Sequence, residues 1–258
     1  MDVGYYLKKD YIGNLILEGK RADGRAFGEM RKLTLEKGFV GEKAPGSARV
    51  RLGDTDVLAG VSLLVGEPYP DRPTEGIMAT SCELRPMADP EFELGPPGEK
   101  SIELARVVDR GIRESGCIDT KKLFIEEEKV WAVFIDLHIL DNDGNLIDAA
   151  GIAAMAALLD ARMPKLENGE IVRGEWGGKL PITCTVVPQT TVKIKDALLF
   201  DPAFDEEYAM DARLTVSTTD TVNAMQKGGL GSFSTDEVLS IVSESFKRAD
   251  AIRRKIEG

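Results

Sequence analysis

Three arginines, Arg106, Arg110 and Arg113, follow one another at intervals of four and three residues within the segment 99–115. At 3.6 residues per turn, these intervals place the three side chains on one stripe of a helix. The apolar residues expected on the adjoining, buried side are Ile102, Ala105, Val108 and Ile112. Such a cationic row could bind a chain of phosphates, because guanidinium groups pair strongly with phosphate oxygens.

Local ion pairing is the alternative interpretation of this row. Glu103, Asp109 and Glu114 lie within one helical turn of the arginines and could neutralise them, which is the usual state of a solvated helix face. Gly111 indicates a tighter environment, because glycine inside a helix costs about 1 kcal/mol relative to alanine. We therefore expect another segment to approach the helix closely there.

Asp205 and Asp211 form a second candidate set, six residues apart after a long β-rich region. Paired carboxylates can serve as general acid and base, although an acidic turn over 201–207 accounts for them equally well. His138 is the single histidine, which argues against His-based triads and multi-His metal sites. The glycine of the turn 141–144 stands at position four, whereas a calcium-binding EF-hand loop has it at position six, so we expect a hairpin turn.

The whole composition is that of a soluble globular protein: 258 residues, of which 43% are hydrophobic and 30% charged. The three cysteines are far apart, and no spacing suits a zinc or redox pair, so we predict no metal and no cofactor. No apolar run approaches the roughly 18 residues of a membrane span, and the first ten residues lack a signal-peptide core, so we expect a cytoplasmic protein without membrane contact. The formal net charge of -11 argues against indiscriminate nucleic-acid binding, so any such contact must be local or supplemented by a partner.

The pattern along the chain predicts strands, a helix, strands and a helix, followed by further strands and a closing helix. The predicted elements are a helix over 5–17, a hairpin over 46–66, a long ordered loop over 67–98, the arginine helix, strands over 123–140, a buried alanine-rich helix over 148–162, strands over 182–200 and 212–222, and a final helix opened by the capping box 234–237. This order indicates an α+β fold. We expect one domain over 1–258, made of two similar halves at about 20–165 and 180–258.

Three motifs occur in a fixed order along this chain. They are Arg21-x-Asp23-Gly24-Arg25 with Arg31, the hairpin from Gly46-Ser47-Ala48 to Gly53-x-Thr55-x-Val57, and Glu103-Leu104-x-Arg106 in the arginine helix. Together they resemble the RNase PH family from Arg21 to the last helix, and they are most similar to the non-catalytic RNase PH-like subunits of the archaeal exosome. The resemblance implies two related βαβα units and a catalytic RNase PH-like sister subunit in a hetero-hexameric ring.

The sequence departs from the active members of that family at the start of the alanine-rich helix. Active members carry a small-polar-Arg sequence there, which binds phosphate together with the helix N-terminus. Here the corresponding residues are Asp148, Ala149 and Ala150. We expect a pocket lined by this carboxylate and two methyl groups to repel phosphate. Asp205 and Asp211 keep the spacing of the family's aspartates, but without a phosphate site we assign no catalytic residue.

The resemblance implies that Arg106 and Arg110, with Arg113 as a third candidate, contact single-stranded RNA. The expected function is that of a non-catalytic subunit that completes its sister's active site during 3′ to 5′ phosphorolytic RNA degradation, with RNA-binding cap proteins as further partners. Two alternatives stay open: a self-sufficient phosphorolytic exoribonuclease and a purely architectural ring subunit.

Overall fold

The computed structural model describes residues 3–167 and 170–258. The helices are α1 Val3–Leu17, α2 Glu99–Ser115, α3 Leu146–Asp160, α4 Phe204–Ala209 and α5 Thr235–Glu257. The strands are β1 Leu33–Lys37, β2 Gly46–Leu52, β3 Thr55–Gly66, β4 Ile77–Leu84, β5 Phe124–Glu126, β6 Lys129–Asp141, β7 Arg162–Glu167, β8 Glu170–Lys179, β9 Val187–Ile194, β10 Ala197–Phe200, β11 Ala212–Thr218 and β12 Val222–Gly228. None of the described helices is long and apolar enough to cross a membrane.

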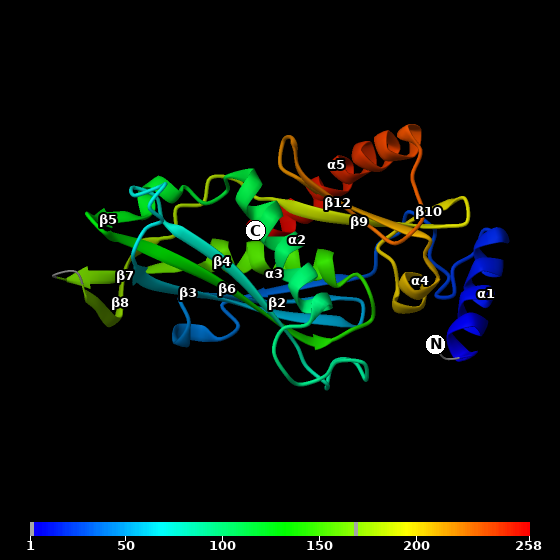
Figure 1. Cartoon of the computed structure of the whole chain (residues 1–258), viewed down its shortest axis with the longest axis horizontal. Coiled ribbons are helices and arrows are strands. Elements are labelled where there is room, and N and C mark those ends of the chain that lie inside the picture. Colours follow the sequence, from blue (N-terminus) through cyan, green and yellow to red (C-terminus); the bar gives the residue numbers. More distant parts are fainter. Residues whose placement is uncertain (1–2, 168–169) are drawn as a thin grey trace.

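The strands form two main sheets and a separate hairpin (Figure 1). The larger sheet has the order β1-β2-β3-β6-β4, with β5 paired to β6, and its neighbours are antiparallel except β4 and β6, which run parallel. The smaller sheet, β10-β9-β11-β12, is antiparallel throughout. β7 and β8 pair with each other. Strands, a helix, strands and a helix therefore follow one another in each half, which confirms the predicted α+β fold.

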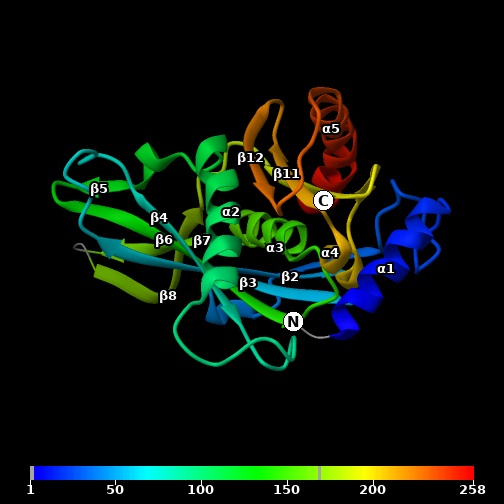
Figure 2. The same cartoon turned by 45° about the vertical axis from the view of Figure 1, so that its right-hand side comes forward.

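α3 lies between the two main sheets, as Figure 2 shows, and contacts β2 and β3 on one side and β9 on the other. Its residues 147–158 are all buried, which explains the alanine-rich sequence: small side chains let both sheets approach the helix. The approach is closest at Gly46 of β2, where a Cβ atom would collide with the backbone of Ala157 and Ala161. The main apolar core contains residues of both halves, so the halves share one interior.

Several local predictions agree with the structure. The arginine helix spans 99–115 as expected, and the hairpin of β2 and β3 turns at Gly53 and Asp54. The capping box of α5 is formed: the Ser234 amide donates to Glu237, and the Glu237 amide donates to the Ser234 hydroxyl. These features depend on residues close in sequence, which explains why they could be predicted.

Other predictions were wrong where distant segments decide the structure. The predicted loop 67–98 contains β4, which becomes a strand by pairing with β6, a partner more than 40 residues later. The segment 141–144 connects β6 to α3 and does not form a hairpin turn. Ile102 is 47% exposed, because Leu104 and Val107 occupy the buried side of α2 in its place. The pairing of β7 with β8 was not predicted; residues 168–169 lie outside the described residues.

Candidate functional site

α2 is positioned by the edge strand of each main sheet and by α3. It contacts β4 of the larger sheet and β12 of the smaller one, as well as α3 (Figure 2). Its buried side consists of Ser101, Leu104, Ala105, Val107, Val108, Gly111 and Ile112. A Cβ atom at Gly111 would lie 3.0 Å from the hydroxyl oxygen of Ser217 in β11. The expected close approach at Gly111 is therefore present, and it fixes the rotation of α2 with its arginine row outward.

The three arginines of this row differ in their partners. Arg106 and Arg110 are exposed and make no ion pair or hydrogen bond with any residue in the described part of the chain. Arg113 is also exposed, but its Nε is 3.0 Å from a carboxylate oxygen of Asp109, and its Nη2 donates to the carbonyl of Met78 at 2.9 Å. Arg106 and Arg110 are therefore without partners among the described residues, whereas Arg113 is already paired.

The nearby carboxylates explain this difference. Asp109 accepts hydrogen bonds from Arg113 and from the hydroxyl of Thr80. Glu103 does not pair with Arg106 in its own helix, because its Oε1 accepts a hydrogen bond at 2.6 Å from Arg213 of β11. Ion pairing with a carboxylate of the same helix, the alternative interpretation of the row, therefore applies to Arg113 alone.

Beside the row is an open surface hollow of about 420 Å³, which we call the arginine hollow. It is lined by Glu103, Arg106, Val107, Asp109, Arg110, Arg113, Glu114 and Gln226. Glu103 also lines a second hollow of about 260 Å³, the central cavity, together with residues of α3, α4 and β11. Glu103 thus stands between the two hollows.

A buried carboxylate, that of Asp148, lies at the start of α3. Asp148 is 1% exposed and accepts hydrogen bonds from the Thr190 amide at 2.9 Å, the Thr190 hydroxyl at 2.7 Å and the Asn145 side chain at 2.9 Å. Burial raises the pKa of Asp148 to about 7. Ala149 and Ala150 are completely buried. The expected pocket lined by these three residues is therefore absent: β9 covers the helix start, and Asp148 is a packed interior group.

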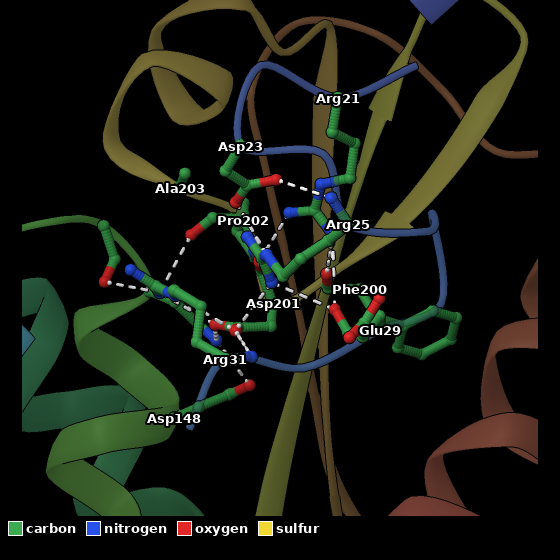
Figure 3. Close-up of polar contacts among 12 residues, drawn as sticks. Arg21, Asp23, Arg25, Glu29, Arg31, Asp148, Phe200, Asp201, Pro202 and Ala203 are labelled. Carbon is green, nitrogen blue, oxygen red and sulfur yellow. Dashed lines mark hydrogen bonds and ion pairs between the residues drawn. The ribbon is translucent and has the colours of Figure 1, made fainter. Parts of the chain in front are cut away.

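A second buried carboxylate, that of Asp201, lies among the arginines of the N-terminal motif (Figure 3). The Asp201 side chain is 3% exposed, and its two oxygens lie 2.8 Å from Arg31 and 3.0 Å from Arg25. Arg21 makes two hydrogen bonds to Glu206 of α4, at 2.8 and 2.6 Å. Burial, the largest single effect, would raise the pKa of Asp201, but the hydrogen bonds and charge of Arg31 together with the hydrogen bond from Asn145 lower it. These guanidinium groups connect the N-terminal loop to α4 and are already occupied by carboxylates.

Asp205 and Asp211 do not form an acid pair in either hollow. Asp205 is 3.0 Å from Lys8 of α1, and Asp211 accepts a hydrogen bond at 2.8 Å from the backbone amide of Lys195. Both side chains are more than 40% exposed. Neither aspartate therefore lies in a catalytic arrangement, and the segment 201–207 is not an exposed acidic turn either, because Asp201 and Glu206 are buried and α4 begins at Phe204.

The central cavity contains a different pair with the same six-residue spacing, Glu207 of α4 and Arg213 of β11. Glu207 accepts a hydrogen bond from the Asn145 amide at 3.1 Å, and burial raises its pKa despite the opposing charge of Arg213. The sequence did not point to this pair, because Asp205 and Asp211 have the same spacing and are both acidic, as a catalytic pair would be. The cavity is also lined by Asp89, Glu103 and Lys100, so acids and cations are mixed there.

Metal ligation has no support in these surroundings. Within 3–167 and 170–258, no group of three or more His, Cys, Asp or Glu side chains could hold a metal ion. His138 lies on β6 with its Nδ1 3.5 Å from a carboxylate oxygen of Glu83, and its side chain is 32% exposed. It is a sheet residue beside a single acid.

Comparison with known proteins gives consistent results over the whole chain. Models of the 3′ exoribonuclease family match at residues 29–164 for domain 1 and 181–248 for domain 2. The exosome complex component Rrp42 of Thermococcus gammatolerans is 49% identical over 96% of this chain and 93% of the relative. A solved Archaeoglobus fulgidus exosome with RNA bound to the active site contains a chain with 44% identity and a TM-score of 0.91, covering 98% of this chain and 99% of that one. A chain of an archaeal exosome core has 41% identity and a TM-score of 0.88, with 99% and 98% covered.

Proposed function

This chain belongs to the 3′ exoribonuclease, or RNase PH, family, and from that premise we propose that it is a non-catalytic ring subunit of an exosome. The proposal is supported by relatives that are named as exosome components and by its close structural similarity to chains of archaeal exosomes. Its partner would be a catalytic RNase PH-like subunit in a hetero-hexameric ring, with RNA-binding cap proteins beside it. In the cytoplasm, the assembly would degrade RNA phosphorolytically from its 3′ end.

The absence of catalysis by this subunit is supported by the start of α3. A phosphate site of this family needs accessible helix N-H groups and a guanidinium. Here the helix start is covered, and Asp148 accepts its hydrogen bonds inside the protein. Phosphate therefore has no receiving group at the start of α3.

RNA contact is supported by one observation above all: Arg106 and Arg110 are exposed and lack partners among the described residues. A backbone phosphate could pair with each guanidinium without first displacing a carboxylate. Such contacts would be insensitive to base sequence and weakened by salt, with about 0.7 counterion released per phosphate on a single strand. In the ring, these two arginines would grip the substrate beside the sister's active site and so complete it.

The experiment is to convert both arginines to glutamate in the ring assembled with its catalytic sister. We expect Arg106→Glu/Arg110→Glu to weaken the binding of a poly(A) oligonucleotide by about tenfold or more and to lower the slope of log affinity against log salt by about 1.4. RNA turnover should fall in parallel. Fluorescence anisotropy at several salt concentrations and the release of nucleoside diphosphates measure the two quantities.

Two variants serve as controls. Lys247→Glu/Lys255→Glu makes the same change in charge on α5, where both lysines are exposed, and should leave RNA binding nearly unchanged. Arg113→Gln removes an arginine that already has protein partners, so it should weaken RNA binding less than Arg106→Gln does. Unchanged binding and turnover in the double glutamate variant would contradict the proposal and favour the purely architectural subunit.

A further inference from the structure

Glu103 is the carboxylate best placed to neutralise Arg106. The two residues are three apart on α2, which makes their side chains neighbours on the helix surface. Both also line the arginine hollow. In an isolated helix we would expect them to pair, and the pair would remove the charge that makes Arg106 useful to a polyanion.

In the folded protein, Glu103 is held by a residue far along the chain. Arg213 lies 110 residues later, on β11, and its Nη2 is 2.6 Å from Oε1 of Glu103. The Arg213 side chain is only 14% exposed, whereas that of Glu103 is 46% exposed. The buried partner therefore fixes the geometry, and the more exposed carboxylate turns toward it.

The surroundings of Arg213 leave its guanidinium little freedom. Its cross-strand neighbour in β12 is Gly228, where a Cβ atom would lie 3.1 Å from Nη2 and 3.3 Å from Nε. A glycine at this position gives the guanidinium the room that it occupies. On another side, the central cavity places Glu207 near enough for the charge of Arg213 to oppose the rise in its pKa. Arg213 is thus a fixed cation between two carboxylates.

We propose that Arg213 is a positioning residue that draws Glu103 away from Arg106 and so keeps Arg106 available to an RNA phosphate. The inference rests on the proposed function and adds to it the means by which the row stays cationic. A parallel arrangement holds the next carboxylate: Asp109 accepts hydrogen bonds from Arg113 and Thr80. The two acids three residues from Arg106, Glu103 and Asp109, are thus both held by other groups.

A set of three variants in the assembled ring tests this inference. Arg213→Gln releases Glu103, which should then pair with Arg106 and weaken poly(A) binding by about threefold, the size of effect expected for one exposed ion pair. Glu103→Gln alone should bind RNA at least as tightly as the wild type, because Arg106 stays free. The double variant Arg213→Gln/Glu103→Gln should regain wild-type affinity, since the carboxylate released by the first substitution is removed by the second. A purely structural role of Arg213 would not give this rescue.

Size-exclusion chromatography and thermal unfolding establish that each variant assembles. If Arg213→Gln does not, Gly228→Ala displaces the guanidinium while keeping its charge, and the same loss and the same rescue by Glu103→Gln are expected. Unchanged RNA binding in Arg213→Gln, or a loss that Glu103→Gln does not restore, would overturn the inference. The Arg106→Glu/Arg110→Glu variant tests the proposed function separately: if it loses RNA binding while Arg213→Gln does not, only the positioning role fails.

Discussion

Asp148 lies in the first turn of α3 beneath β9, where burial disfavours a charged side chain. The hydrogen bonds from Thr190 and Asn145 favour its ionised form, but burial is the larger effect and raises its pKa to about 7. In the unfolded chain, the pKa of an aspartate is near its ordinary value of about 3.9. The folded protein therefore binds a proton at this residue over a pH range in which the unfolded chain does not.

This difference predicts a pH-dependent stability. Because the folded pKa is the higher one, the stabilising contribution of the protonated group is complete below about pH 4 and is lost as the pH rises through about 7. We expect the free energy of unfolding of the wild type, relative to Asp148→Asn, to fall by about 2–4 kcal/mol from pH 5 to pH 8. Urea unfolding of both proteins at the two pH values measures it. A difference independent of pH would show that Asp148 keeps one protonation state throughout.

Among the elements, α3 depends on close packing more than the other helices do. Its small side chains admit β2 on one side and β9 on the other, and Gly46 of β2 lies directly against the helix backbone near Ala157. Any side chain at residue 46 must push the strand away from the helix. The element that separates the two sheets therefore also fixes their spacing.

Gly46→Ala should consequently destabilise the protein by about 1–3 kcal/mol, the usual cost of overpacking a close-packed interior. Differential scanning calorimetry measures this loss, with Gly60→Ala in the neighbouring strand β3 as the control, because a Cβ atom at Gly60 would meet no atom within 4 Å. A melting temperature that is lowered equally in both variants would contradict the assignment of the effect to the contact between β2 and α3.

The whole molecule carries a formal net charge of -11, yet one hollow presents two arginines that have no partner among the described residues. Its overall field should repel RNA, so binding by the isolated chain should be weak, and productive contact would require the ring. The features that oppose phosphate binding, the covered start of α3 and the buried Asp148, belong to this chain. A partner could supply activity without altering them.

The isolated chain is therefore expected to be inactive in phosphorolysis. Incubated with poly(A) and inorganic phosphate, it should release no nucleoside diphosphate, whereas the ring assembled with the catalytic sister should release it readily. Chromatography of the products distinguishes the two results. Diphosphate release by the chain without its sister would instead support the alternative of a self-sufficient exoribonuclease.

The sequence by itself determined the features that arise from neighbouring residues. The helical period placed Arg106, Arg110 and Arg113 on one stripe, and the capping box at Ser234 opened α5 where expected. Hydrogen bonds between residues three or four apart form these structures, so a short window of sequence contains the information. The order of strands and helices, and with it the α+β fold, followed from the same local periodicities.

Tertiary structure alone decided which of these residues are free to act. Arg113 is paired and Arg106 is not, because Glu103 is held by Arg213, a residue 110 positions away. The burial of Asp148 beneath β9 is likewise a contact between distant segments, and so is the pairing of β4 with β6. An ion pair or a buried acid depends on which side chains the fold brings within a few ångströms, and spacing along one chain does not specify that.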